Sequence, residues 1–334
     1  MYISEQLSSP DDRRLRLSTQ LGVTHLVVDN RHAQPGSVGA GCGPWDAGRL
    51  ADYRRWIEGF GLRLDVFALG LGSVLSAAMT DLDSARRQRA VLADNIRKAG
   101  DAGIDCLKYA TRLGLADRTA PRPGRGGAQN PSFDYAEYRH ERAGYAHSAP
   151  APSEKAGWDA IEFLVEGLLP AADAAGVRLA CHPQDPAFPV GGPGQAGHAF
   201  GSVDGIRRFL ALSPSRHHGL TFCQGSVAGM FKEPAKAMVP VIEEFAATGR
   251  IFLVKFRNIR GGYLDFQEVF PDEGDVDLFQ AIKAYQRGGY AGPLCTDHVP
   301  ASPLDEGQER FTAFCLGYTR GLLQAAGVSR PVPR

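Results

Sequence analysis

The sequence lacks an excess of charge of either sign. Its 334 residues carry 37 basic and 37 acidic side chains, and no long run of one sign interrupts them. Such a chain has no electrostatic footprint for nucleic acid or for an anionic membrane surface. This composition favours a small polar molecule as the partner and excludes nucleic acid and membranes from the expected partners.

Membrane spans, targeting signals and paired cysteines are also missing. No segment approaches the length of a transmembrane helix, and residues 1–17 show no basic stretch followed by an apolar core. The six cysteines, at positions 42, 106, 181, 223, 295 and 315, show no CxxC spacing. This scatter argues against a disulfide framework and a structural zinc site. We therefore expect a cytoplasmic protein with reduced thiols.

Short apolar runs alternate with helical patterns along the chain. The runs predict seven strands, over residues 24–28, 62–69, 104–109, 177–181, 220–223, 251–256 and 292–296. Helices are predicted over residues 84–99, 154–175, 203–212, 234–248, 277–287 and 306–326, with caps at Asp83 or Ser84, at Ser153 and at Asp275. Strands separated by helices pair in parallel, so the pattern favours a (β/α)8 TIM barrel over an open doubly wound sheet.

One polar stretch interrupts this alternation. We expect a single barrel domain over residues 1–334, with an insertion over residues 117–152 after the third predicted strand. Its weak apolar periodicity leaves two alternatives: an ordered lid or oligomer contact, and a disordered segment. No GxGxxG or Walker-type loop follows an early strand, which argues against a dinucleotide or ATP site.

Reactive side chains collect where the predicted strands end. His182, Cys223, Lys255 with Arg257, and Asp297 with His298 end four consecutive strands. In a parallel barrel these strand ends converge on one mouth, where barrel enzymes place their active sites. A single histidine or cysteine of this kind would more often be structural. Repetition over four strands favours a functional cluster.

The types of side chain in this cluster favour a metal ion. Imidazole, thiolate and carboxylate suit Mn²⁺, Fe²⁺, Co²⁺ or Zn²⁺ better than Mg²⁺. His182, Cys223 and Asp297 would be three ligands, which leaves positions open for substrate oxygens. His298 would move a proton. Arg257 would either hold a substrate carboxylate or form an internal salt bridge.

Five segments of the chain resemble motifs of the mannonate dehydratase family. They are HPQDP at residues 182–186, CQGS at 223–226, KFRN at 255–258, DEGDVD at 272–277 and CTDH at 295–298. Their order and spacing make the resemblance specific. It extends from about residue 177 to residue 326 and fades in the N-terminal half.

The resemblance implies a xylose-isomerase-like barrel that removes water from D-mannonate to give 2-keto-3-deoxygluconate. It implies Mn²⁺, or a similar ion, held in part by His182, Cys223 and Asp297, with His298 as the acid/base, and a homo-oligomer. Substrate binding is expected from Arg257, Asp185, Gln184, Ser226 and Asn258. Gln184 and Asp185 would alternatively orient the imidazole of His182 or cap the following loop.

Lys255 departs from the family pattern, because it stands where the family has a fourth metal ligand, a histidine. A protonated lysine has no lone pair for a metal, and its charge would repel one. Either Lys255 moves aside from a three-ligand site, or its ammonium replaces the ion. A buried lysine with a lowered pKa would also be able to act as a base. Lys255 is therefore counted among the catalytic residues.

A second departure lies before Asp297, where Cys295 and Thr296 replace the arginine and proline of the family. The leading hypothesis is a lyase acting on a sugar acid. A metal-dependent sugar isomerase or epimerase remains an alternative, because it would share the barrel and the ion but would not need a carboxylate contact. A barrel that only binds a sugar ligand is the alternative outside enzymes.

Overall fold

The structure is a computed structural model that describes residues 1–34, 36–111, 118–142, 153–188 and 199–328. Eight parallel strands close into a barrel in the order β1-β12-β9-β8-β7-β4-β3-β2. They are β1 (Tyr2–Leu7), β2 (His25–Val28), β3 (Arg63–Ala68), β4 (Cys106–Ala110), β7 (Arg178–His182), β8 (His218–Cys223), β9 (Ile251–Lys255) and β12 (Pro293–Thr296). The predicted TIM barrel is confirmed, and the open sheet is wrong.

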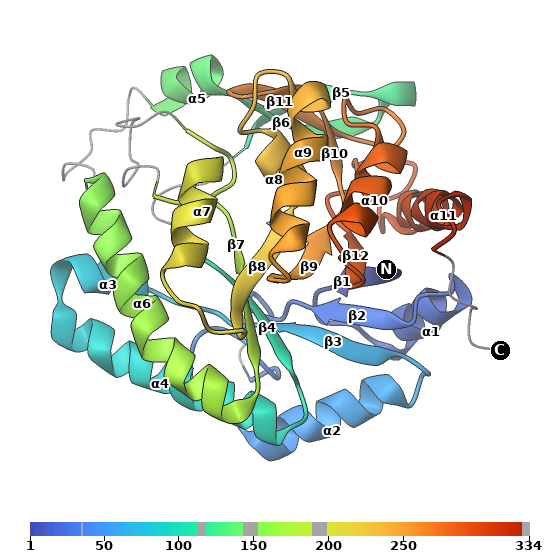
Figure 1. The fold of residues 1–334 in the computed structure, drawn as a ribbon. Coiled ribbons are helices and arrows are strands. Elements are labelled where there is room, and N and C mark those ends of the chain that lie inside the picture. Colours follow the sequence, from blue (N-terminus) through green and yellow to red (C-terminus); the bar gives the residue numbers. More distant parts are fainter. Residues whose placement is uncertain (35, 112–117, 143–152, 189–198, 329–334) are drawn as a thin grey trace.

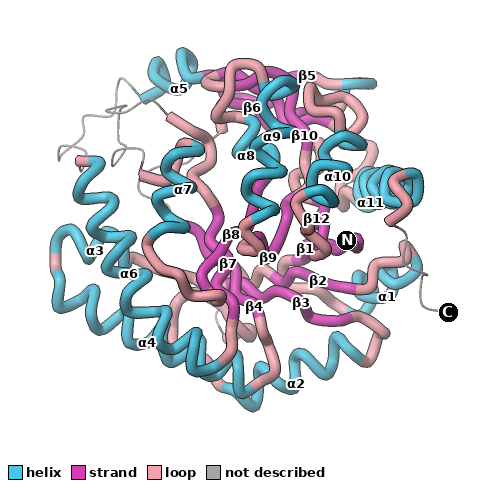
Figure 2. The backbone as a smooth tube through the Cα atoms, in the orientation of Figure 1, coloured by secondary structure: helices cyan, strands magenta, loops and turns pink. Residues whose placement is uncertain are grey.

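Helices surround the barrel strands, which lie at the centre of the view in Figure 2. They are α1 (Asp12–Gln20), α2 (Ala47–Glu58), α3 (Val74–Thr80), α4 (Leu82–Asp101), α6 (Glu154–Ala175), α7 (Val203–Ala211), α8 (Gln224–Ala228), α9 (Pro234–Ala247), α10 (Leu278–Arg287) and α11 (Glu309–Ala325). Ser153 caps α6 as predicted, through a hydrogen bond from Ala156 N. Two caps were misplaced: Asp81 caps α4 and Asp277 caps α10.

A second sheet lies over one end of the barrel, at the top of the view in Figure 1. Its antiparallel strands are β5 (Thr119–Pro123), β6 (Gln129–Asp134), β10 (Asn258–Gly262) and β11 (Asp265–Val269), in the order β10-β11-β6-β5. A short 3-10 helix, η1 (Arg125–Gly127), joins β5 to β6, and α5 (Tyr135–Arg142) follows β6. Disorder is therefore wrong for residues 118–142 of the predicted insertion. Residues 112–117 and 143–152 lie outside the described residues.

Side chains inside the barrel form an apolar layer with a polar layer above it. The apolar layer consists of Val27, Val66, Cys106, Ala180, Phe252, Leu253 and Cys295. Because side chains alternate along a strand, the residue two positions further on points into the same interior. That rule places five polar residues in one layer at the carboxyl end of the barrel: Asp29, Lys108, His182, Lys255 and Asp297.

The cysteines and the helices bear on two further expectations, reduced thiols and the lack of a membrane span. All six cysteines are free, and five of them are buried. Among the described helices, none is long and apolar enough to cross a membrane. The assignment of the whole chain to one domain stays a prediction.

Candidate active site

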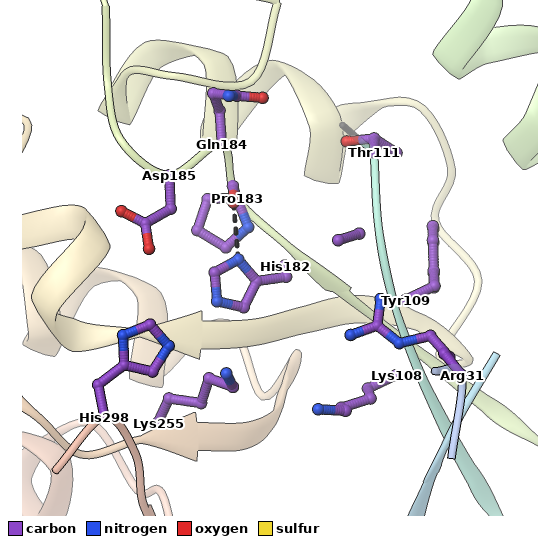
Figure 3. Close-up of a pocket in the computed structure, with 11 residues that line it drawn as sticks. Arg31, Lys108, Tyr109, Thr111, His182, Pro183, Gln184, Asp185, Lys255 and His298 are labelled. Atoms are coloured by element: carbon purple, nitrogen blue, oxygen red, sulfur yellow. Dashed lines mark hydrogen bonds between the residues drawn. The ribbon is translucent and has the colours of Figure 1, made fainter. Parts of the chain in front are cut away.

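A pocket opens above the polar layer, at the carboxyl ends of the barrel strands (Figure 3). The space around it is about 570 Å³ when the part that opens to solvent is counted. Eleven residues line it: Arg31, Lys108, Tyr109, Ala110, Thr111, His182, Pro183, Gln184, Asp185, Lys255 and His298. The structure thus brings five of the predicted site residues, 182, 184, 185, 255 and 298, to one pocket.

Lys255 and Asp297 form a buried ion pair on one side of this pocket. The Lys255 Nζ lies 2.8 Å from the Asp297 Oδ1, and the two side chains are 9% and 2% exposed. Burial lowers the pKa of Lys255, but Asp297 and Cys223 outweigh it, so this pKa is raised. Burial raises the pKa of Asp297, yet the neighbouring His298 and Lys255 hold it well below its usual range. Both groups therefore carry their charges at neutral pH.

A second buried ion pair lies on the other side of the pocket. The Lys108 Nζ is 2.9 Å from the Asp29 Oδ2 and also contacts the side chain of Gln6. Arg31 adds two bonds to Asp29, of 2.8 Å from Nε and 2.7 Å from Nη2. Burial, followed by the charge of Lys255, lowers the pKa of Lys108 to about 8. In Figure 3 the ammonium groups of Lys108 and Lys255 point toward each other.

His298 is held at the mouth of the pocket by a buried carboxylate. Its Nδ1 lies 2.5 Å from the Glu268 Oε2 on β11 and 2.5 Å from the Arg257 Nη1. Arginine can only donate, so the arrangement that fits both neighbours is an Nδ1–H of His298 that donates to Glu268 beside the Arg257 guanidinium. Burial raises the pKa of Glu268, but Arg257 and His298 lower it to about 2. Among the described residues Nε2 of His298 has no hydrogen bond, and Asp297 Oδ2 lies 3.8 Å from it, so this nitrogen can exchange a proton with a bound molecule.

Arg257 is occupied by the protein itself. Its guanidinium lies 2.7 Å from Asp185 and 2.8 Å from Glu268, and it donates to the Ser226 hydroxyl at 3.0 Å. Gly225 makes room for this side chain, because a Cβ there would lie 2.4 Å from the Arg257 Nε. Of the two roles that the sequence allowed for Arg257, substrate binding and an internal salt bridge, these contacts match the salt bridge. Arg257 therefore positions two carboxylates instead of offering a free fork.

The other predicted substrate contacts divide into two groups. The amide of Asn258 donates to the backbone oxygens of Pro271 and Val276, at 3.1 and 2.8 Å, so it ties a loop together. Gln184, in contrast, lines the pocket, and its buried Nε2 has no hydrogen-bond partner among the residues that the structure describes. Asp185 Oδ1 is buried and unpaired in the same way. Buried polar atoms of this kind are available to a water molecule or to a ligand's hydroxyl group.

The residues predicted to hold a metal ion do not fit one. The ammonium of Lys255 already bonds Asp297. A protonated lysine has no lone pair to offer an ion, and its charge lies beside the carboxylate that would be a ligand. A divalent ion about 4 Å from an ammonium would be repelled by about 8 kcal/mol at an effective dielectric constant of about 20.

Over the described parts of the chain, no group of three or more His, Cys, Asp or Glu side chains could hold an ion. Lys255 lies against Asp297 and has not moved aside, and the assignment of His182, Cys223 and Asp297 as metal ligands stays a prediction. Manganese, the expected cofactor, has no fitting set of donors among these residues.

Sequence reasoning missed several residues of the site. Lys108 had a visible signal, because it is a lone charge inside an apolar strand and shares the inward face with Cys106. Asp29 directly follows a strand and had the same kind of signal. Glu268 and Arg118 had none, since both belong to the second sheet or its edge, which the strand and helix alternation did not predict.

Comparisons with known sequences agree with the family resemblance of the sequence motifs between residues 182 and 298. A family model described as D-mannonate dehydratase (UxuA) matches residues 147–330. Mannonate dehydratase 2 of Halalkalibacterium halodurans is 28% identical over 285 residues, which cover 77% of this chain and 79% of the relative. Mannonate dehydratase of Streptococcus uberis is 26% identical over 283 residues, covering 76% and 78%.

Solved structures share the same fold. The mannonate dehydratase from Streptococcus suis serotype 2 matches with a TM-score of 0.81 at 22% identity, over 100% of this chain and 98% of that one. A xylose isomerase domain protein from Planctomyces limnophilus matches with a TM-score of 0.62 at 14% identity, over 98% and 100%. Because the family model covers more than half of the sequence, the chain belongs to the D-mannonate dehydratase family.

Proposed function

We propose that this protein is a hydro-lyase that removes water from a sugar acid such as D-mannonate to give a 2-keto-3-deoxy acid. Membership of the D-mannonate dehydratase family supports the reaction class. The observation that carries the proposal is the Glu268–His298 pair, in which the imidazole lines a polar pocket. Such a pair is the usual means of moving a proton at neutral pH.

In the proposed reaction, His298 Nε2 takes the proton from C2 of the aldonate. The electron pair of the broken C–H bond forms the C2–C3 double bond, and the C3 hydroxyl departs. The imidazolium returns its proton to that hydroxyl, which leaves as water. The resulting enol becomes the 2-keto acid. Glu268 keeps its charge and stabilises the imidazolium during this cycle.

The surrounding residues have supporting roles in this proposal. Lys255 supplies positive charge near the carbon that loses its proton. Arg257, with Ser226 behind it, positions Glu268 and Asp185. Gln184 and Asp185 offer unpaired polar atoms to substrate hydroxyls. No step requires a metal ion.

Replacement of His298 tests the proposal. The His298→Asn variant should lose about 10²–10⁴ in kcat for D-mannonate, and exchange of the C2 proton with D₂O, followed by NMR, should fall with it. The His140→Asn variant, which changes an exposed histidine on α5, serves as the control. Unchanged turnover in His298→Asn would refute the assignment of the proton-transfer residue.

An isomerase acting on a free sugar is the second candidate, because several barrels of similar fold are epimerases. One is a D-psicose 3-epimerase from Clostridium cellulolyticum, with a TM-score of 0.62 at 11% identity. Such a likeness reflects the fold alone. Turnover of D-mannonate and D-gluconate should be compared with that of D-mannose and D-fructose. Turnover of the sugars alone would favour the isomerase.

A further inference from the structure

We propose that the cation of this active site is part of the chain: the ammonium groups of Lys255 and Lys108 stand in place of a divalent ion and together bind one substrate carboxylate. The identity of that carboxylate, as the one of a sugar acid, rests on the proposed function. The two lysines themselves are placed by the barrel.

The barrel brings the two lysines to one level from separate strands. Lys255 ends β9 and Lys108 lies in β4, and the strands β8 and β7 separate them in the sheet. Each lysine lies two residues after a member of the apolar layer, Leu253 and Cys106 respectively. Both ammonium groups therefore enter the interior, and they point toward each other over that layer (Figure 3).

Each lysine has one carboxylate that keeps it in place without filling the pocket. Asp297 bonds Lys255 at 2.8 Å, and Asp29 bonds Lys108 at 2.9 Å. Both lysines are still among the residues that line the pocket. An ammonium group has three donors, so donors remain for a bound anion after each pair has formed.

The charge of the whole cluster favours one monovalent anion. Five cationic side chains, Arg31, Lys108, Arg118, Lys255 and Arg257, face four carboxylates, Asp29, Asp185, Glu268 and Asp297. With the imidazoles of His182 and His298 left out of the count, one positive charge is left over. A monocarboxylate would neutralise it, whereas a divalent cation would raise the excess to three positive charges in a buried site.

This arrangement also suits the reaction. Removal of the C2 proton spreads negative charge onto the oxygens of the substrate carboxylate. Two fixed ammonium groups at those oxygens stabilise that charge as it develops, which is the task of a metal ion in other enzymes that form enolates. The bond changes are those of the proposed dehydration, and no further reactant is needed.

Metal content tests the first half of the inference without any substrate. Wild-type protein purified without chelator and dialysed against Mn²⁺ should hold less than about 0.1 ion per chain by elemental analysis. The Lys255→His variant should take up about one ion per chain, because the new imidazole joins His182, Cys223 and Asp297 as a donor with a lone pair. The Lys236→His variant, on the exposed side of α9, is the matched control and should stay metal-free.

Aldonate binding tests the second half. In the presence of EDTA, D-mannonate should still bind the wild type in isothermal titration. The variants Lys108→Gln and Lys255→Gln should weaken this binding at least about tenfold. The variants Lys108→Arg and Lys255→Arg keep the positive charge and should retain part of the affinity for D-mannonate. Circular dichroism identifies any variant that fails to fold, and the wild-type results do not depend on the variants.

The outcomes separate this inference from the proposed function. About one Mn²⁺ per wild-type chain, with D-mannonate binding abolished by EDTA, would overturn the inference. A metal-free wild type that binds neither D-mannonate nor D-gluconate would overturn it as well. A metal-free wild type that binds D-mannonate without dehydrating it would support the inference and refute the proposed function.

Discussion

The two sides of the pocket are built from the same pair of side chains in different surroundings. On one side, β9 and the adjacent β12 supply Lys255 and Asp297. On the other side, β4 supplies Lys108 and the end of β2 supplies Asp29, with β3 between them and Arg31 as a third partner. The comparison shows that a barrel can hold two like charges at one mouth when each has its own carboxylate.

Removing the carboxylate beneath the histidine should have the largest effect on the reaction. The Glu268→Gln variant keeps the volume but cannot hold the Nδ1–H tautomer or stabilise the imidazolium, so kcat should fall by about 10²–10⁴ while KM changes little. Steady-state kinetics with D-mannonate checks this. A drop in kcat/KM that arises from KM alone would mean that Glu268 acts only on binding.

The two lysine–aspartate pairs should contribute similarly to stability. Asp297→Asn and Asp29→Asn each leave a buried cation without its carboxylate, which should lower the free energy of unfolding by about 3–5 kcal/mol. Urea denaturation measures the loss, with Asp204→Asn, an exposed aspartate on α7, as the control. A small loss at Asp29 beside a large loss at Asp297 would break the equivalence of the two sides.

The space that Gly225 leaves for Arg257 should be needed to keep Arg257 in contact with Glu268 and Asp185. The Gly225→Ala variant places a methyl group against the arginine and should cost about 1–3 kcal/mol in unfolding free energy. Its kcat should fall as Glu268 and Asp185 shift. Gly321→Ala, where α11 leaves open space, is the matched control and should be neutral or slightly stabilising.

A buried histidine away from the pocket should give the smallest effect, a dependence of stability on pH. Burial lowers the pKa of His218 to about 4, while Phe209 O accepts a bond from its Nε2. Its folded pKa lies below the ordinary value of about 6.5, so the unfolded state binds more protons between these values. The free energy of unfolding should therefore decrease as the pH is lowered from about 6.5 to about 4, by about 1.4 kcal/mol per pH unit near pH 5.

Denaturation at pH 7 and pH 5, compared between the wild type and His218→Gln, measures this contribution. The variant should lose part of the wild-type dependence and keep the part due to His182. An identical dependence in both proteins would show that folding does not shift the pKa of His218.

The sequence predicted the side of the pocket that lies in motifs, and missed the side that does not. Seven of the eight barrel strands were recognisable as apolar runs. The eighth, β1, was missed because Ser4, Glu5 and Gln6 make it polar although Ser4 and Glu5 are buried. Its polarity has a physical cause, since Glu5 pairs with Arg14 and Ser18 on α1.

Partnership between side chains was harder to predict than position. Arg257 lies two residues past the end of β9, and its engagement with Glu268 depends on β11, a strand in a sheet assembled from two distant parts of the chain. Lys255 was recognised as a departure from the family, but only the structure shows that it bonds Asp297. Strand periodicity predicts where a side chain points, and it does not predict which residue meets it there.

The second sheet links the inserted segment to the position of Glu268. Glu268 lies on β11, and β11 pairs with β6 through Phe266 and Phe133, so the insertion must dock before the carboxylate can hold His298. The position of this carboxylate therefore depends on contact between segments that lie far apart in the sequence.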